Sequence, residues 1–521
     1  MKRVIAAAAV ALAFITPGLT ARQLPPYGGA AEFRADLAQR RAAAMQAIGP
    51  ESVLILWSAP ARVYSTDVNY EYRQDSNTLY LTGLTQEDSI LVLIPGARSK
   101  REIVFTREAN PRRELWEGHT LTPTEVTDSS GIANVMPLRA FQPFVDGLLS
   151  GTGDQTVAEG ASEFGTLLSA VKQGTAKLAV IGGGAAAGRG GGTPAPPTPG
   201  TPRAFAEEMR TKYPGVTSTN ATTVLTTLRQ VKTPYEQKVL RRSVEISAEA
   251  HLEGMKAARP GRWEYEVEAA IEFWYLKNGA MSWGYPSIVG SGPNATTLHY
   301  GASTRQMQNG DLLLVDAAGN FQGLTGDITR TYPINGKFTK EQREIYEVVL
   351  AAQEAGLAVA KPGARTADVT AAVRAKCAEG LLKLGLITDA SQLSTWLPHG
   401  PVHGIGIDVH DPLGATFAAG SAFVIEPGLY FREDSLQNIG RSGGRGRAGG
   451  QGASGNPPPP ATPAADPAEI LAKVRPIFEK YRNIGIRIED SFLMTESGPV
   501  NLSVKAPRQV ADIEKVVGTG R

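Results

Sequence analysis

The sequence predicts an α+β protein in which a smaller α/β domain precedes a larger domain of helices and antiparallel strands. Three observations lead to this prediction. Short apolar runs alternate with amphipathic stretches up to about residue 180. Long helical stretches then flank strand-like runs from residue 311 onward. Finally, 42% hydrophobic and 20% charged residues in a chain of 521 are typical of folded domains and not of a disordered chain.

Charge and cysteine content exclude several classes of function. Lys and Arg number 53 against 51 Asp and Glu, so no basic excess predicts binding to nucleic acid. The single cysteine, Cys377, excludes an internal disulfide and a Cys-rich zinc site. Any metal chemistry therefore has to use Asp, Glu and the six histidines.

The N-terminus is typical of an export signal. Residues 1–3 are Met-Lys-Arg, and an apolar run of twelve follows from Val4 to Ile15. That length suits a signal peptide and is short for a membrane-spanning helix, so we predict a signal peptide over residues 1–21 and a periplasmic or secreted protein. A buried N-terminal helix is the alternative. No other run is long and apolar enough to predict a membrane span in the mature chain.

Residues 22–225 are predicted to form the α/β domain. Residues 32–48 read as an amphipathic helix, with Arg41 as the exception on its apolar face. Residues 52–57, 89–94 and 102–105 read as strands. A Gly/Pro-rich insert at 182–202 ends this region, and one or two helices follow to about Val216.

Residues 226–521 are predicted to form the larger domain. Helices are expected at 234–258 and 264–278, with two more between Thr339 and Leu384. The strand-like runs are 311–317, 327–332, 422–425 and 485–492. A second Gly/Pro-rich insert occupies 440–467.

Two aspartates are the first candidate site residues. Asp316 ends one strand-like run and Asp327 begins the next, with turn-forming residues between them. A hairpin centred at 321.5 would place the two carboxylates opposite each other on one face, where they repel and favour a cation. Two solvated carboxylates at a strand edge are the alternative.

Histidines and two glutamates extend the pattern. His399, His403 and His410 fall within twelve residues of a Gly-rich segment, which favours metal or proton chemistry. Glu426 ends an apolar strand, and Glu489 alternates with apolar residues on a later one. Either glutamate alone could be an ordinary solvent-facing residue.

In their contexts, these residues resemble the "pita-bread" metallopeptidases of family M24, and within them the aminopeptidase P group. The matching stretches are VDAAGNFQGLTGDITRTYPINGKFT, HGPVHGIGIDVHD, IEPGLY and GIRIEDSFLMTESG. Upstream, YRQDSNTLYLTGLTQEDSILVLIP and LWEGHTLTP are similar to the N-terminal domain of that group. The resemblance implies a C-terminal creatinase/aminopeptidase-like pita-bread catalytic domain.

The resemblance also implies a metal site. Two divalent metal ions, Mn²⁺ with Co²⁺ or Zn²⁺ as replacements, would be held by five residues, with Asp327 and Glu489 bridging. The five are Asp316, Asp327, His403, Glu426 and Glu489.

Further roles follow from the same resemblance. Glu426 would move the proton of the nucleophile, while His299, His399 and His410 would contact or line the substrate site. Arg487 and Tyr430 match positions that orient the metal carboxylates. The sequence departs from the family pattern at three positions near His403 and Glu426, which leaves substrate preference open. These positions are Val402, Gly404 and Val424.

The implied activity is hydrolysis of the bond between an N-terminal residue and a following proline in a peptide. The nearest alternative is a dipeptidase that cleaves only Xaa-Pro dipeptides, and a remote one is a non-catalytic peptide-binding module. By analogy with the family we expect a homo-oligomer, with proline-containing peptides as its binding partners.

Overall fold

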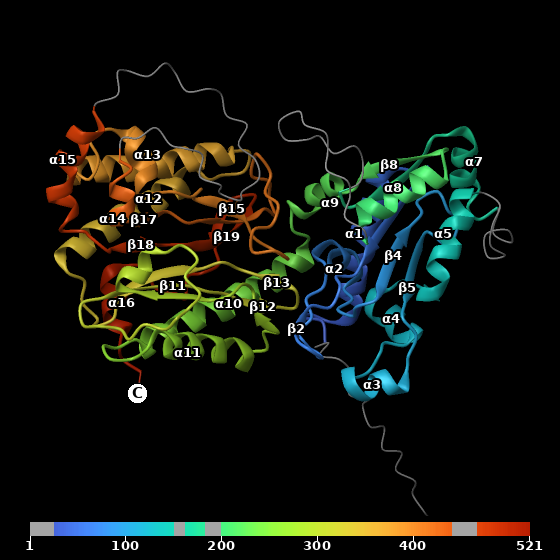
Figure 1. The fold of residues 1–521 in the computed structure, drawn as a ribbon, viewed down its shortest axis with the longest axis horizontal. Helices are drawn as coiled ribbons and strands as arrows, with labels where there is room; N and C mark the ends of the chain where they lie inside the picture. Colours follow the sequence, from blue (N-terminus) through green and yellow to red (C-terminus); the bar gives the residue numbers. More distant parts are fainter. Residues whose placement is uncertain (1–24, 151–161, 183–199, 440–465, 521) are drawn as a thin grey trace, which may run out of the picture. The chain divides into compact units, whose positions relative to one another are not determined.

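The computed structural model describes residues 25–150, 162–182, 200–439 and 466–520 (Figure 1). The chain forms two compact units, Met1–Thr222 and Thr223–Arg521. The signal peptide predicted at 1–21 and nearly all of the two Gly/Pro-rich inserts lie outside the described residues. Within the described ranges, no helix combines the length and the apolar character that a membrane crossing requires.

The first unit is built on a six-stranded mixed sheet. Its strands are, in spatial order, β6 (Asn134–Pro137), β5 (Glu102–Thr106), β4 (Ser89–Leu93), β1 (Ser52–Trp57), β7 (Ala176–Val180) and β8 (Val216–Asn220). The pairs β1–β4 and β4–β5 are antiparallel, and the outer pairs are parallel. The three strands expected from the sequence are confirmed at the centre of the sheet. The three outer strands were not predicted.

Helices and short elements complete this unit. They are α1 (Ala30–Ile48), β2 (Val63–Ser65), β3 (Val68–Asn69), α2 (Ser76–Thr82), α3 (Pro111–Glu117), α4 (Pro123–Ser130), η1 (Leu138–Ala140), α5 (Phe141–Ser150), α7 (Gly165–Gln173) and α8 (Pro202–Lys212). Alternate residues of the central strands are buried on opposite faces: Val53 and Ile55 join a core with α5, α7 and α8. The other face carries α1 and α2.

Arg41 interrupts the apolar face of α1, and the structure shows why. The side chain is buried, with its Nε 2.9 Å from a carboxylate oxygen of Glu102. Its Nη1 donates to the backbone carbonyls of Leu81 and Ser130. A buried guanidinium is tolerated because these acceptors satisfy it.

The second unit consists of antiparallel strands between two helix pairs, as Figure 1 shows. The helices are α9 (Thr222–Arg229), α10 (Pro234–Ala257), α11 (Glu264–Lys277), α12 (Lys340–Val359), α13 (Thr366–Leu384), α14 (Glu433–Leu436), α15 (Pro467–Phe478) and α16 (Val510–Val516), with short 3₁₀ segments η2 (Gly292–Thr296) and η3 (Ala390–Thr395). The α10 start is set by a capping box in which Thr233 and Glu236 bond each other's backbone N–H. The four long helices expected from the sequence are confirmed.

The described strands of this unit form four small sheets. In spatial order they are β10 (Ile288–Ser291), β11 (Leu312–Asp316) and β14 (Thr329–Pro333); β13 (Leu324–Thr325), β12 (Gly319–Phe321) and β9 (Ser282–Trp283); β15 (Val402–Gly404), β16 (Ala422–Ile425), β19 (Asp490–Thr495) and β20 (Gly498–Asn501); and β17 (Gly428–Tyr430) with β18 (Gly485–Arg487). These strands and the two helix pairs make an α+β unit, as the sequence predicts.

The hairpin after Asp316 exists, but its predicted register is wrong. Asp316 lies opposite Thr329 and not opposite Asp327. The chain leaves the β11–β14 ladder, forms the separate pair β12–β13 and returns, so Asp327 lies in a break between β13 and β14. A turn centre read from the sequence could not reveal this break.

The expected strand 485–492 is also interrupted. It is divided into β18 and β19, which belong to different sheets, and Ile488 and Glu489 lie between them. Glu489 instead forms a single bridge to Thr329, with its N–H donating to the Thr329 carbonyl at 3.0 Å. The break brings Glu489 beside the end of the Asp316 hairpin.

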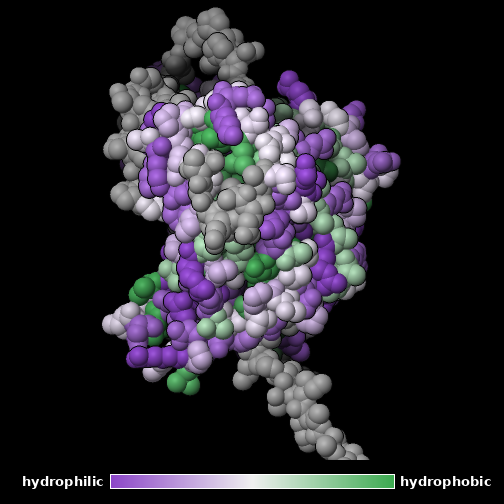
Figure 2. All heavy atoms as spheres, turned by 90° about the vertical axis from the view of Figure 1, so that its right-hand side faces the viewer, coloured by the Kyte–Doolittle hydropathy of each residue, from purple (hydrophilic) through white to green (hydrophobic). Residues whose placement is uncertain are grey.

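The molecular surface is mixed in polarity. Figure 2 shows a face dominated by hydrophilic residues, on which hydrophobic residues appear in separate patches. The most exposed large apolar side chains are Leu115 and Trp116 of α3, each 81% exposed.

Candidate metal centre

The five residues proposed as ligands come from separate segments of the second unit. Asp316 ends β11, Asp327 lies in the hairpin break, His403 lies in β15, Glu426 directly follows β16, and Glu489 separates β18 from β19. Their donor atoms form overlapping groups whose members all lie within 4.8 Å of one another. These groups are Asp316, Asp327 and Glu489; His403, Glu426 and Glu489; and Asp327, His403 and His410.

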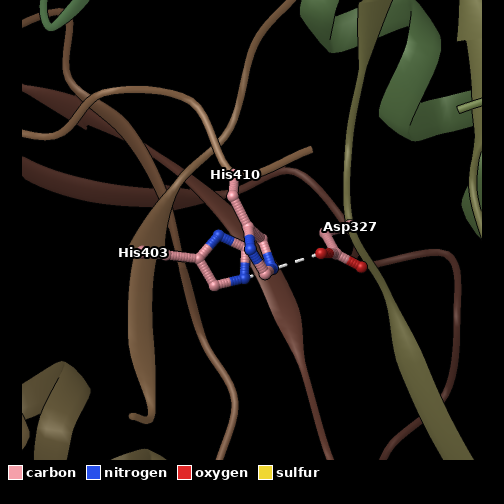
Figure 3. A group of neighbouring side chains, drawn as sticks. All are labelled: Asp327, His403 and His410. Atoms are coloured by element: carbon pink, nitrogen blue, oxygen red, sulfur yellow. Dashed lines mark ion pairs between the residues drawn. The ribbon is translucent and has the colours of Figure 1, made fainter. Parts of the chain in front are cut away.

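His403 lies at the centre of this cluster. Its Nε2 is 3.4 Å from a carboxylate oxygen of Glu426, 3.6 Å from one of Asp327 and 3.7 Å from one of Glu489. Figure 3 shows the ring directed toward Asp327, with the His410 ring beside it, and the two ring centroids are 4.1 Å apart. Its Nδ1 lies 3.0 Å from the Gly404 carbonyl oxygen, which leaves Nε2 to face the carboxylates.

The carboxylates carry more negative charge than their surroundings balance. Burial, together with the neighbouring acidic groups, raises the pKa of Glu489 to about 8 and the pKa values of Asp327 and Glu426 well above their usual range. Glu489 is 1% exposed, and its buried Oε1 has no hydrogen-bond partner among the described residues. A buried, unpaired carboxylate oxygen among other acids is costly unless a cation occupies the space before it. The donor set therefore fits a divalent cation that prefers oxygen with one imidazole.

Arg487 holds one side of the cluster. Although burial opposes ionisation, its guanidinium lowers the pKa of Asp316, to which Nη2 donates at 2.5 Å. Nη1 donates to the Tyr430 hydroxyl at 2.7 Å and Nε to Thr329 Oγ1 at 3.0 Å. The Thr329 hydroxyl in turn donates to Glu489 Oε2 at 2.7 Å, so one arginine orients two carboxylates.

Tyr285 is a site residue that the sequence reasoning missed. Its hydroxyl lies 2.7 Å from Asp316 Oδ1 and 2.5 Å from Asp327 Oδ1. Burial between these acids raises the pKa of Tyr285 well above its usual value, so the hydroxyl remains a donor. A single Tyr before Pro286 has no local signature, and only the folded structure brings it to the two aspartates.

Gln353 of α12 donates hydrogen bonds to the backbone of two segments that carry proposed ligands. Its buried Nε2 donates to the carbonyl of Ile425 at 3.0 Å and to that of Ile488 at 3.3 Å. These residues directly precede Glu426 and Glu489. The helix thus sets the spacing of two ligands that are far apart in sequence.

The other histidines divide into two groups. His399 lies beside the cluster, with Nε2 3.0 Å from the Tyr430 hydroxyl and Nδ1 3.7 Å from Glu426 Oε2, and burial lowers its pKa to about 4. His299 and part of the His410 side chain are open to solvent. The pKa of His410 is lowered, mainly by partial burial of its ring and also by the charge of His299, whereas Asp316 opposes this shift.

His119 and His251 do not join the cluster. His119 Nε2 lies 2.8 Å from a carboxylate oxygen of Glu125 in the first unit. His251 is fully buried in α10, and its Nε2 lies 3.0 Å from the Ala317 carbonyl oxygen. Both histidines therefore make local contacts away from the cluster.

The close packing around Gly404 accounts for one of the three departures from the family pattern, the absence of a larger residue at this position. A Cβ built at this position would lie 2.6 Å from the Asp411 carbonyl oxygen and 3.0 Å from that of Pro412. A larger side chain at 404 would therefore require the 411–412 backbone to move. Val402 and Val424 lie on the neighbouring strands β15 and β16.

A pocket of about 310 Å³ opens beside Pro398 and Tyr430. Its lining includes Leu298 and Pro398, which directly precede His299 and His399, and Tyr430, whose hydroxyl lies beside His399. Arg432 also borders it and donates to Thr297 Oγ1 at 3.2 Å. A space of this size beside the cluster is large enough for part of a small ligand.

The chain is similar to known proteins along nearly its whole length. Residues 238–496 match the model of metallopeptidase family M24, and residues 37–158 match that of the aminopeptidase P N-terminal domain. The Xaa-Pro aminopeptidase of Escherichia coli (strain K12) is 30% identical over 496 residues, which cover 94% of this chain and 98% of the relative. The human Xaa-Pro dipeptidase is 32% identical over 318 residues, or 55% of this chain and 59% of the relative.

A solved structure shows the same architecture. Zinc-substituted aminopeptidase P from Escherichia coli in complex with product superposes with a TM-score of 0.71 at 28% identity, covering 94% of this chain and 99% of that one. Because the match covers 94% of this chain, it extends over both units.

Proposed function

Because the chain belongs to metallopeptidase family M24, we propose that it is a dinuclear-metal aminopeptidase that hydrolyses the bond between an N-terminal residue and a following proline. The observation that carries this proposal is the buried cluster of four carboxylates and His403, with an unpaired oxygen on Glu489. Relatives named Xaa-Pro aminopeptidase that align over the full length support the choice of substrate.

We propose two divalent ions at this cluster. Asp316, Asp327, His403, Glu426 and Glu489 would hold them, and four carboxylates would balance the charge of two divalent ions. Oxygen donors with a single imidazole suit Mn²⁺, with Co²⁺ and Zn²⁺ as replacements. When bound, such ions polarise the scissile carbonyl and make a water molecule acidic at neutral pH.

The side chains around the cluster have separate roles in this proposal. Glu426 is placed to accept a proton from the attacking water, and His399 borders the same space 3.7 Å away. The proline nitrogen of the substrate has no hydrogen and has to be protonated as the bond breaks. We assign His410 and the exposed His299 to the substrate side of the site, and the pocket beside Leu298 and Pro398 to part of the peptide.

A peptide-length series tests the proposal. The full-length protein is incubated with Mn²⁺ and with Xaa-Pro, Xaa-Pro-Yaa and longer Xaa-Pro peptides, and the released N-terminal residue is measured. We expect cleavage of the tripeptide and the longer peptides. Cleavage of the dipeptide alone would instead establish a dipeptidase. This is the second candidate, because the human Xaa-Pro dipeptidase is similar to part of this chain.

Glu426→Gln is the matched variant for this series. The substitution keeps the shape of the side chain and removes the carboxylate that would accept the proton, so activity should fall by at least about 100-fold. Glu496→Gln, on an exposed residue outside the site, serves as its control. Retained activity in Glu426→Gln would overturn the assignment of the proton acceptor.

We also propose that the protein is exported through residues 1–21. The support is the basic start followed by an apolar run of twelve residues. N-terminal sequencing of the mature protein purified from its native host checks this. A mature chain that still begins at Met1 would refute it.

A further inference from the structure

One buried carboxylate holds both ends of the loop that carries His299. The loop joins β10 to β11, and Glu264, the first residue of α11, lies fully buried beneath it. Its Oε1 accepts hydrogen bonds from the Ser291 backbone N–H at 2.6 Å and the Ser291 hydroxyl at 2.7 Å, where β10 ends. Its Oε2 accepts from the Arg305 backbone N–H at 2.9 Å, where the loop returns toward β11.

The same carboxylate reaches the residue next to His299. The Tyr300 hydroxyl donates to Glu264 Oε2 at 2.9 Å. Leu298 and Tyr300 pack against a small buried cluster that includes Tyr430, whereas His299 between them is exposed. The two inward-facing neighbours thus decide the side on which His299 projects, and Glu264 fixes one of them.

A neutral side chain of the same shape could not replace this carboxylate. Its two oxygens accept from Ser291, Tyr300, Arg305 and, at 3.1 Å, the Asn294 side-chain amide. A carboxylate offers about four acceptor sites, whereas a glutamine offers one acceptor oxygen and presents donors in place of the other. The residue also lies at the N-terminus of α11, where negative charge is favourable.

We propose that Glu264 is a positioning residue for His299, holding the β10–β11 loop so that this histidine faces the substrate side of the metal centre. The inference rests on the proposed function, because that function gives His299 its contact with substrate. Within the part of the chain that the structure describes, the hydrogen bonds of Glu264 go to this loop and not to the proposed metal ligands.

A double-mutant cycle tests the coupling between the two residues. Glu264→Gln is measured alone and in the His299→Ala background, with kcat and KM determined on an Xaa-Pro-Yaa peptide in Mn²⁺. We expect kcat to fall roughly 10- to 100-fold in the otherwise unchanged protein and by less than about twofold once His299 is absent. Equal losses in both backgrounds would overturn the proposal, since Glu264 would then act independently of His299.

Two further variants separate positioning from a general loss of folding. Tyr300→Phe removes a single hydrogen bond to Glu264 and should show the same dependence on His299 with a smaller loss. If Glu264→Gln does not fold, Tyr300→Phe replaces it in the double-mutant cycle with His299→Ala. Glu236→Gln changes another buried carboxylate at a helix start in the same unit and should show no such dependence.

A structural readout distinguishes failure of the inference from failure of the proposed function. Hydrogen exchange of the backbone amides of residues 292–305 should quicken in Glu264→Gln and not in Glu236→Gln, with the bound Mn²⁺ content unchanged in both. Unchanged exchange would overturn the anchoring role even if peptides are cleaved. Faster exchange in a protein that cleaves no Xaa-Pro peptide would refute the proposed function and leave the anchor in place.

Discussion

Raising the pH from 6.5 to 8 is expected to destabilise the metal-free protein. The reason is Glu489, whose pKa is raised from 4.5 to about 8, mainly by burial and then by Asp316. In the unfolded chain this carboxyl is already ionised at pH 6.5, whereas the folded protein holds its proton until about pH 8. The folded state therefore binds more protons in this window, and the free energy of unfolding falls as the pH rises.

The magnitude follows from the width of the window. A group protonated only in the folded state changes stability by about 1.36 kcal/mol per pH unit well below its folded pKa and by about half of that at the pKa, so Glu489 alone accounts for about 1.7 kcal/mol between pH 6.5 and 8. Asp327 and Glu426, whose pKa values are also raised, act in the same direction. The lowered pKa of Asp316 contributes a constant term here, because that carboxyl is ionised in both states.

The buried histidines act in the opposite direction over the lower part of this window. Burial lowers the pKa of His403 to about 3 and that of His399 to about 4. At pH 6.5 such a histidine is neutral in the folded protein but about half protonated in the unfolded chain, so each one adds about 0.4 kcal/mol of stability between pH 6.5 and 8. These contributions cancel in the difference between the wild type and a Glu489 variant, and that difference therefore reports the carboxyl.

Denaturant unfolding of the chelator-treated protein measures the change of stability with pH. Glu489→Gln should make the slope less negative by about 1.1 kcal/mol per pH unit on average between pH 6.5 and 8, and should make the metal-free variant more stable than the wild type at pH 8. Glu496→Gln, exposed and outside the cluster, should leave the slope unchanged. Adding Mn²⁺ should stabilise the wild type most at the higher pH, because binding requires ionised carboxylates. Equal slopes in the metal-free wild type and Glu489→Gln would refute the reasoning.

Three further predictions concern the surroundings of the cluster. Arg487→Met removes the guanidinium that keeps Asp316 ionised and should weaken Mn²⁺ binding at least about tenfold in a chelator competition, and unchanged affinity would contradict the role of the arginine. Tyr285→Phe removes the hydroxyl shared by two aspartates and should lower kcat roughly 3- to 30-fold with metal still bound, whereas full activity would show that the hydroxyl is dispensable. Deleting residues 440–467 should leave the metal content per chain unchanged by elemental analysis, because closing a shorter loop changes the entropy little, and loss of metal would show that the insert supports the site.

Much of the candidate site could be read from the sequence because ligands occur in short, recognisable contexts. The sequence predicts the five clustered residues, and the structure places their donor atoms in overlapping groups. Local sequence does not reveal the contacts between residues that lie far apart along the chain. In the sequence, Arg41 is an exception on the apolar face of its helix. In the structure its guanidinium donates hydrogen bonds to Glu102, Leu81 and Ser130, none of which is near it in sequence.

The hairpin register shows the same limit. Asp316 and Asp327 do lie together, and the Tyr285 hydroxyl is within hydrogen-bond distance of both, but they do not face each other on paired strands. Equal spacing from a turn predicts a partner only while the ladder continues, and here the two strands change sheets. The proximity was therefore predicted for a reason that the structure does not support.

The interrupted strands explain how acidic side chains are held close together before any cation binds. At the first break, the Ser491 hydroxyl accepts from the Asp327 N–H at 3.0 Å and donates to the Asp327 carbonyl at 2.7 Å, so that backbone remains satisfied outside a ladder. At the second break, Thr329 accepts the Glu489 N–H and donates its hydroxyl to the Glu489 carboxylate. Ser491, two residues after Glu489, thus satisfies the backbone at the Asp327 break. Thr329, two residues after Asp327, does the same at the Glu489 break. Because these contacts do not involve a metal, they keep the acidic side chains close together in the metal-free protein. The cost of ionising them side by side helps to raise the pKa values of Asp327, Glu426 and Glu489, and a bound cation offsets that cost.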